Sequence, residues 1–168
     1  MPNAEEPRDR VMVIAAHPDD PEFGCAGTVV KWAQAGKTIT YVLLTSGDKG
    51  SPDPELRPGR LAALREEEQR AAAAELGVAH VLFLRYPDGL LENNLELRRH
   101  LTNILRQQRP HIVLTIDPWR HYQLHPDHRA AGQAVRLPPV ELGDALGAHA
   151  FPLHDFKIVA DAVSHTLQ

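Results

Sequence analysis

The chain has 168 residues, of which 43% are hydrophobic and 24% charged, and its formal net charge is −4. This is the composition of one globular domain, and no apolar run approaches the roughly 18 residues needed to cross a bilayer, so a membrane-spanning protein is excluded. The negative charge, with Arg and Glu interleaved along the chain, also argues against a nucleic-acid-binding surface.

The N-terminus and the cysteine content limit location and metal chemistry. Residues 1–10 are polar and carry acids as well as Arg8 and Arg10, which does not match a signal peptide. We therefore expect a cytoplasmic protein with a frayed leader. Because Cys25 is the one cysteine in the sequence, any metal has to be held by histidines and carboxylates.

The first predicted unit is a strand, a loop and a helix. Residues 11–16 form a continuous apolar run, typical of a strand buried on both faces in a parallel sheet, and they lead directly into His17. Pro21 and Gly24 then predict a turn. Residues 26–35 show apolar positions at helical spacing and predict the first helix.

The next unit repeats the order of strand and helix. Residues 38–45 are β-branched and apolar and predict a second strand, followed by a long loop of turn formers. Residues 60–76 are strong helix formers that end before Gly77. The apolar face of this helix is predicted to consist of Leu61, Leu64, Ala71, Ala72 and Leu76.

Two further strand–helix units follow. Residues 80–84 predict a third strand, which ends in the turn Tyr86-Pro87-Asp88-Gly89, and residues 95–107 predict an amphipathic helix. Residues 111–116 predict a fourth strand. Residues 126–135 predict another helix, since Pro126 suits a first helical turn.

This alternation predicts an α/β fold of the Rossmann-like, three-layer kind, with a mostly parallel sheet, helices on both faces and right-handed crossovers. We expect residues 1–168 to form a single domain. Residues 137–168 form an atypical C-terminal segment in which 156–163 fit a last strand or a short helix.

Two clusters of metal-binding residue types stand where strands end or helices begin. His17-Pro18-Asp19-Asp20 follows the first strand, and His125-Pro126-Asp127-His128 opens the helix over residues 126–135. Open α/β sheets hold their sites at the carboxyl ends of the strands. A catalytic zinc takes typically three protein ligands and leaves a position open for water, so the two clusters together supply a complete site.

The sequence resembles a known family at these motifs. Ala16-His17-Pro18-Asp19-Asp20 and His125-Pro126-Asp127-His128-Arg129-Ala130 are similar to motifs of the PIG-L/LmbE-like family of zinc-dependent N-acetylglucosaminyl deacetylases. The resemblance covers about residues 11–135, including Arg65-Glu66-Glu67 and the turn Pro87-Asp88-Gly89. It implies a hydrolase that removes the N-acetyl group from an N-acetylglucosamine-type sugar or small glycoconjugate.

The resemblance implies a metal centre and a base. His17, Asp20 and His128 would bind Zn²⁺, or another divalent ion such as Fe²⁺, and Asp19 would be the general base that activates the bound water. The partner would be a small amino-sugar substrate, with no nucleic acid or membrane involved. A homo-oligomer is compatible with this scheme.

Further roles follow from the same resemblance. A protonated imidazole at His125 would stabilise the tetrahedral oxyanion and assist departure of the amine, and Asp127 would orient His125 or tune its pKa. Arg65 and Asp88 match positions that contact sugar hydroxyls.

Structural roles are the alternatives for these residues. Asp19 suits an N-cap or Asx turn, His125 and Asp127 suit a solvated helix start, Arg65 suits a solvated helix face, and Asp88 suits an ordinary turn. Two other functions are compatible with parts of the sequence: a zinc-binding but catalytically impaired relative, and a nucleotide-binding doubly wound module. The acidic cluster in place of a Gly-rich turn would repel phosphate and argues against the nucleotide.

Overall fold

A computed structural model describes residues 9–53, 55–136 and 157–160 of the chain. Its strands are β1 (Arg10–Ala15), β2 (Thr38–Thr45), β3 (His80–Tyr86), β4 (Ile112–Thr115) and β5 (Lys157–Ala160). Within the described ranges they form one sheet in the order β3-β2-β1-β4-β5, and every neighbouring pair is parallel.

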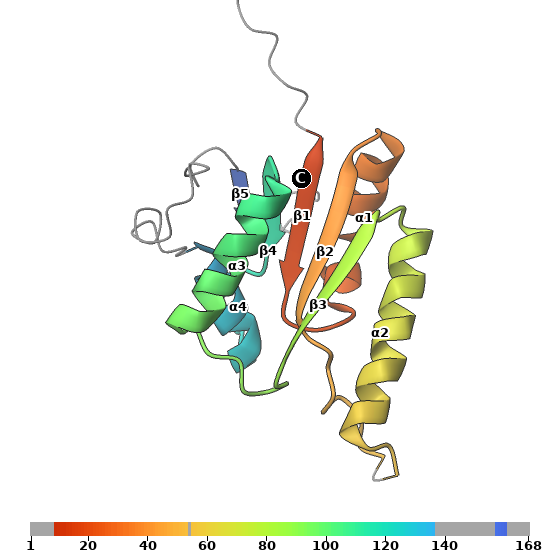
Figure 1. Cartoon of the computed structure of the whole chain (residues 1–168), viewed down its shortest axis with the longest axis vertical. Helices are drawn as coiled ribbons and strands as arrows, with labels where there is room; N and C mark the ends of the chain where they lie inside the picture. The colour runs from red at the N-terminus through yellow and green to blue at the C-terminus, as the bar shows by residue number, and fades with distance from the viewer. Residues whose placement is uncertain (1–8, 54, 137–156, 161–168) are drawn as a thin grey trace, which may run out of the picture.

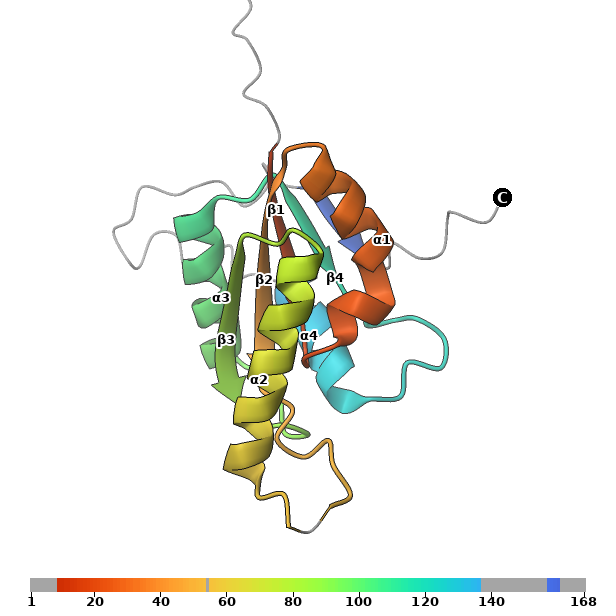
Figure 2. The same ribbon diagram turned by 90° about the vertical axis from the view of Figure 1, so that its right-hand side faces the viewer.

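The helices cover both faces of this sheet. They are α1 (Asp20–Gln34), α2 (Pro58–Glu75), α3 (Leu95–Gln108) and α4 (Pro126–Arg136). Figure 1 and Figure 2 show α1 and α2 together on one face, with α3 and α4 on the other. The predicted three-layer α/β architecture is confirmed.

Two apolar cores, one on each face, explain the continuous apolar run of the first strand. Successive side chains of a strand point to opposite faces of the sheet. Met12 and Ile14 pack with the residues of α3 and α4, whereas Val11 and Val13 pack with those of α1 and α2. Because β1 is central and covered on both sides, its positions from Val11 to Ala15 are all buried and apolar.

Most predicted element boundaries agree with the structure to within two residues, but α1 differs. This helix begins at Asp20 rather than at residue 26, so the predicted turn at Pro21 and Gly24 is wrong. Pro21 lies in the first helical turn, where its missing N–H removes no intrahelical hydrogen bond. The helix therefore starts inside the first polar cluster and places Asp20 at its N-terminus.

The buried face of α2 also differs from the prediction. Leu64 and Ala71 are exposed, and the buried positions are occupied by Leu61, Glu66, Gln69 and Ala73. A polar pair thus lies where an apolar stripe was expected. Both side chains bind loops at the carboxyl ends of the strands, and these contacts account for their burial.

The C-terminal segment is described over one strand. Lys157–Ala160 forms β5, which decides between the strand and the short helix expected for residues 156–163. Residues 1–8, 137–156 and 161–168 lie outside the described residues. The leader and the single-domain boundaries stay predictions.

The topology places both polar clusters at one point. The chain order reverses beside β1, since β2 and β3 lie on one side of it and β4 and β5 on the other. Ligands of open α/β sheets bind at such a switch point, outside the carboxyl ends of the strands. The clusters after β1 and before α4 both lie at this edge.

Gly132 of α4 provides a test of the packing beside this edge. A Cβ at Gly132 would contact Ile116 O and lie 2.8 Å from Pro118 Cδ, so the helix approaches the chain after β4 too closely for a side chain. We expect Gly132→Ala to lower the free energy of unfolding by about 1–3 kcal/mol, measured by urea denaturation. The matched control is Gly27→Ala in α1, where no atom lies within 4 Å. This control is expected to raise stability by about 0.5–1 kcal/mol, and equal effects of the two changes would contradict the close approach.

Candidate metal centre

Three side chains from the two clusters meet with the spacing of metal ligands. His17 Nδ1 lies 3.2 Å from His128 Nε2 and 3.5 Å from Asp20 Oδ2, and Asp20 Oδ1 lies 3.0 Å from His128 Nε2. Ligand atoms about 2.0–2.2 Å from a tetrahedral zinc lie about 3.3–3.6 Å from one another. These three residues fit a metal ion with shifts of a few tenths of an ångström.

The charges of the trio favour a cation between its members. Burial would raise the pKa of Asp20, but hydrogen bonds with His128 and His17 outweigh it and hold that pKa well below the ordinary value. Asp20 is therefore an anion over the whole physiological range. Burial by itself would lower the pKa of His17. The carboxylates of Asp20, Asp127 and Asp88 outweigh this effect, so the pKa of His17 is raised. The acidic surroundings stabilise positive charge at this point.

The second ring nitrogen of His17 faces two buried carboxylates. His17 Nε2 lies 3.1 Å from Asp88 Oδ1 and 3.1 Å from Asp127 Oδ2. Asp127 is 0% exposed, and its two oxygens also accept hydrogen bonds from the backbone N–H groups of Gly89 (2.7 Å) and Leu91 (3.1 Å). These contacts fix the orientation of the His17 ring.

Two other trios in the described residues could also hold a metal. They are His17 with His125 and His128, and His17 with Asp88 and Asp127. In the second trio, both carboxylates already accept backbone N–H groups, because Asp88 Oδ2 binds Lys49 N at 2.9 Å. Metal-binding histidines usually donate their other N–H to a carboxylate. This pattern favours the Nδ1 side of His17 as the metal side and the Nε2 side as its support.

Asp127 contacts two histidines through different atoms. The resemblance implies that Asp127 orients His125 or tunes its pKa. Its carboxylate oxygens bind His17 Nε2 and two backbone N–H groups, and its charge partly opposes the lowering of the His125 pKa. Its backbone N–H donates to His125 Nδ1 at 3.2 Å. This bond leaves the proton of a neutral His125 ring on Nε2.

His125 lies beside the trio and is exposed. Its ring centroid is 4.7 Å from that of His17 and 4.8 Å from that of His128. Burial and the two neighbouring imidazoles lower the pKa of His125. The charges of Asp127 and Asp88 oppose this lowering of the pKa, and the protonated His125 that the resemblance implies stays a prediction.

Asp19 has an unusual backbone and a partly exposed carboxylate. It occupies the N-cap position of α1, but its φ of 78° is in the left-handed region and its side chain makes no capping hydrogen bond to the helix. Burial raises the pKa of Asp19; Arg65 opposes this effect, and Asp20 adds to it. The result is a carboxylate that is more basic than usual beside the trio.

Arg65 of α2 binds the loop that carries Asp19. Its guanidinium donates to Pro18 O at 2.9 Å and to Asp19 Oδ2 at 3.0 Å. It also reaches Gly47 O at 3.4 Å, in the loop after β2. The side chain is 18% exposed, so Arg65 joins three segments rather than forming a solvated helix face.

One open cavity of ≈ 430 Å³ collects these groups. Seven of the eight predicted site residues line this cavity, and the eighth, Asp127, is fully buried. Lys49, Gly50 and Gly89 complete the walls. The structure therefore brings together residues from the ends of β1 and β3, from α2 and from the start of α4. Asp88 lines the cavity although both of its oxygens are already in contact with protein groups.

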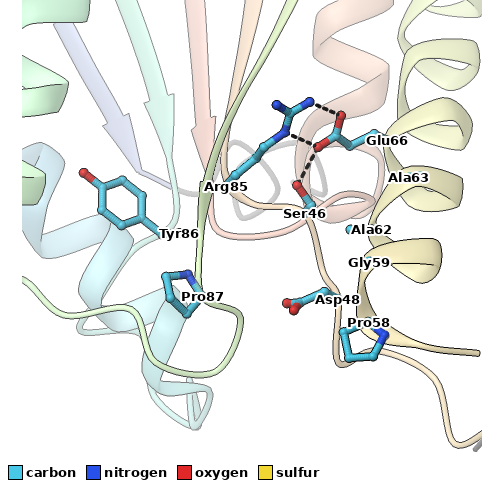
Figure 3. A pocket seen from close by; sticks show the side chains of 10 residues that line it. All are labelled: Ser46, Asp48, Pro58, Gly59, Ala62, Ala63, Glu66, Arg85, Tyr86 and Pro87. Atoms are coloured by element: carbon cyan, nitrogen blue, oxygen red, sulfur yellow. Dashed lines mark hydrogen bonds and ion pairs between the residues drawn. The ribbon is translucent and has the colours of Figure 1, made fainter.

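A second cavity of ≈ 490 Å³ is lined by Asp48 and Pro87, the sequence neighbours of Lys49 and Asp88, and by residues of α2. Figure 3 shows Glu66 on its wall, bound by Arg85 and Ser46. Arg85 makes two hydrogen bonds to the Glu66 carboxylate, at 2.8 and 3.0 Å, and Ser46 Oγ makes a third at 2.7 Å. Arg85 has φ 57° where the pairing of β3 with β2 shifts register. The buried Glu66 thus ties α2 to the carboxyl ends of β2 and β3.

Sequence reasoning missed Glu66 and Gln69 as supporting residues. Both are buried, at 5% and 2% exposure, and both bind loops at the site edge. The available signal was their helical spacing with Ala73, which puts two polar side chains on a core-facing stripe. Only buried polar groups with partners are tolerated at such positions.

Comparison with known proteins identifies a family model and several relatives. A family model described as "PIG-L: GlcNAc-PI de-N-acetylase" matches residues 12–137. The diacetylchitobiose deacetylase of Thermococcus kodakarensis is 41% identical over 123 residues, which cover 73% of this chain and 46% of that protein. A probable N-acetyl-alpha-D-glucosaminyl L-malate deacetylase 2 of Bacillus anthracis is 35% identical, over 74% of this chain and 57% of that protein.

A solved structure is similar along most of the chain. The N,N'-diacetylchitobiose deacetylase of Pyrococcus horikoshii superposes with a TM-score of 0.82 at 33% identity, over 92% of this chain and 60% of that one. The chain thus spans about half the length of the curated relatives it matches. Among the described residues, no helix combines the length and apolarity needed to cross a membrane. The cytoplasmic location and the oligomeric state stay predictions.

The contact between Asp127 and His17 predicts an effect on metal affinity. Asp127→Asn replaces one acceptor oxygen by a donor and disturbs the support of the His17 ring. We expect the affinity for Zn²⁺ to fall about 10- to 100-fold, measured by competition with a chromophoric chelator. The control is Asp53→Asn, which alters an exposed carboxylate in the loop before α2. Equal affinity in the two variants would contradict a supporting role of Asp127.

The ion pairs of Glu66 predict a pH-dependent stability. Hydrogen bonds from Arg85 outweigh burial, and with those from Ser46 and Arg70 they lower the pKa of Glu66 to about 2. A carboxyl with a depressed pKa stabilises the fold above its unfolded pKa, and this stabilisation is lost as pH falls toward the folded pKa. Glu66→Gln should therefore lower the free energy of unfolding at neutral pH.

The deficit of Glu66→Gln should shrink below the ordinary pKa of 4.5, as pH falls toward 2, in urea denaturation at each pH. Glu67→Gln, an exposed change on the same helix, is the matched control and should have little effect at any pH. A deficit that does not depend on pH would show that packing, and not the charge of Glu66, is responsible.

Proposed function

We propose that this chain, which belongs to the PIG-L family of GlcNAc-PI de-N-acetylases, is a zinc-dependent hydrolase that removes the N-acetyl group from an N-acetylglucosamine-type sugar or small glycoconjugate. The observation that carries the proposal is the trio of His17, Asp20 and His128 with a separate carboxylate, that of Asp19, in the same cavity. A ligand set plus an independent base is what metal-assisted hydrolysis of an amide requires.

His17, Asp20 and His128 would hold the zinc. The donor set of two imidazoles and one carboxylate, with no thiolate, matches catalytic rather than structural zinc sites. When bound, the ion polarises the amide carbonyl and lowers the pKa of the attacking water. The protein holds the trio rigid through the His17–Asp127 contact and through the hydrogen bond from His17 N to Asp20 Oδ2, at 2.8 Å.

Asp19 would take the proton from water. Arg65 binds Asp19 Oδ2, which leaves Oδ1 to accept that proton, and the raised pKa of Asp19 strengthens it as a base. The attack gives a tetrahedral oxyanion. When the carbon–nitrogen bond breaks, Asp19 returns the proton to the nitrogen, so that acetate and a free amine leave.

His125 would stabilise the oxyanion. Because its Nδ1 accepts the backbone N–H of Asp127, a neutral ring presents Nε2–H as a hydrogen-bond donor. In this scheme the amine takes its proton from Asp19, and not from an imidazolium at His125.

Arg65 and Asp88 act mainly on the protein in this proposal. Arg65 holds the Asp19 loop, and Asp88 shares the support of His17 with Asp127. Both also line the cavity, so a sugar hydroxyl can meet the edges of these side chains. The substrates to assay are those in the names of the relatives, diacetylchitobiose and N-acetylglucosaminyl malate.

The role of Asp19 has a direct test. Asp19→Asn removes the base but keeps the size of the side chain, and should lower kcat for acetate release about 10²- to 10⁴-fold with little loss of bound zinc. Acetate release and zinc content are measured on the same zinc-loaded samples.

Asp48→Asn, whose carboxylate lines the second cavity, is the control and should keep full activity. Activity that survives Asp19→Asn would exclude Asp19 as the base. Tight zinc binding without acetate release by the unmodified chain would support a catalytically impaired relative instead.

A further inference from the structure

We infer that Gln69 is a positioning residue that fixes the backbone of Asp19, and that Glu22 sets the orientation of the Gln69 amide. The inference rests on the proposed function, in which Asp19 is the general base. It concerns side chains of α1 and α2 that contact neither the metal trio nor the proposed path of the reacting atoms.

The backbone of Asp19 needs an external partner. Its φ of 78° and ψ of −25° are disfavoured for a residue with a Cβ. Its own side chain does not compensate, since it makes no capping hydrogen bond and its Oδ2 is bound by Arg65. Strained conformations persist only where the surrounding structure holds them.

Gln69 supplies that partner. The backbone N–H of Asp19 donates to Gln69 Oε1 at 2.7 Å, and Gln69 is 2% exposed. Gln69 follows Arg65 by about one turn on α2, so one helix binds both the backbone and the carboxylate of Asp19. Two contacts from a rigid helix restrict the position of the base more than either contact does alone.

Glu22 decides which end of the Gln69 amide faces Asp19. Gln69 Nε2 donates to Glu22 Oε1 at 2.9 Å, and a carboxylate can only accept at this position. The amide oxygen is thereby directed to the N–H of Asp19. Glu22, Gln69 and Asp19 thus form two consecutive hydrogen bonds that connect the two helices, and the donor and acceptor of each bond are fixed.

The metal trio is held by other contacts. His17 N donates to Asp20 Oδ2, and His17 Nε2 binds Asp127, in both cases without Gln69. Loss of Gln69 should therefore displace Asp19 more than it disturbs the ligands. This separation predicts a change in kcat with little change in zinc content.

The first test is Gln69→Met, which keeps length and volume but removes both hydrogen bonds. We expect kcat for acetate release to fall about 10- to 100-fold, with KM within about threefold of the wild-type value and zinc content unchanged. The matched control is Gln107→Met, an exposed position on α3, which should leave all three values unchanged. A folded Gln69→Met chain with wild-type kcat would overturn the inference.

The second test exchanges the two partners. Gln69→Glu alone keeps an acceptor for Asp19 but sets a carboxylate against Glu22, and should lower kcat. Adding Glu22→Gln restores a donor–acceptor pair in the reverse sense while the oxygen facing Asp19 is retained, so the double variant should recover most of the lost kcat. If the double variant has a kcat no higher than that of Gln69→Glu, the proposed pair of hydrogen bonds is contradicted.

The third test does not depend on activity. Hydrogen exchange of the Asp19 amide, followed by NMR, should be slow in the wild-type chain and in the double variant, and faster in Gln69→Met. Unchanged exchange in Gln69→Met would overturn the inference, even if kcat fell. A wild-type chain that releases no acetate but shows this exchange pattern would refute the proposed deacetylase and support the hydrogen bond.

Discussion

The rest of the site depends on the contacts that the imidazole of His17 makes on both of its sides. One nitrogen faces Asp20 and His128, and the other faces the buried carboxylates of Asp88 and Asp127. A ring held on both sides has one orientation, and that orientation fixes the distance between the end of β1 and the start of α4. Burial of Asp127 is tolerated because backbone N–H groups and the His17 ring satisfy its oxygens.

The second constraint comes from α2. A helix that only covers the sheet would bury an apolar stripe, but α2 buries Glu66 and Gln69 and nearly buries Arg65. Each of these side chains satisfies a group in a loop at the carboxyl edge of the sheet. The helix therefore contributes less hydrophobic stabilisation than a helix with an apolar stripe would. In return, its polar side chains hold the loops in a defined arrangement. The left-handed backbone of Asp19 lies where Arg65 and Gln69 of this helix bind the loop.

The fold was largely predictable from local patterns, and the exceptions have physical reasons. The apolar runs of β1 and β2 identify strands buried on both faces, because no helix-forming residue pattern competes there. The start of α1 was misplaced because Pro21 and Gly24 are turn formers in isolation, while Pro is also well suited to a first helical turn. The polar stripe of α2 was misread because helix periodicity identifies a buried face only when that face is apolar.

By itself, the sequence determined the alternation of strands and helices, the parallel sheet, and the two clusters that hold imidazoles and carboxylates. These features depend on residues that are close together in the sequence, and such residues determine periodicity and turn preferences. Only the tertiary structure decided that the Asp127 carboxylate binds His17 while its backbone N–H binds His125, and that Gln69 binds the backbone of Asp19. The first and last of these pairs lie 110 and 50 residues apart, and no local pattern distinguishes a carboxylate that binds one histidine from a carboxylate that binds another. His17-Pro18-Asp19-Asp20 thus contains the reactive side chains. The packing of α2 and α4 against this segment determines which of its atoms face the proposed metal and which are bound by other protein groups.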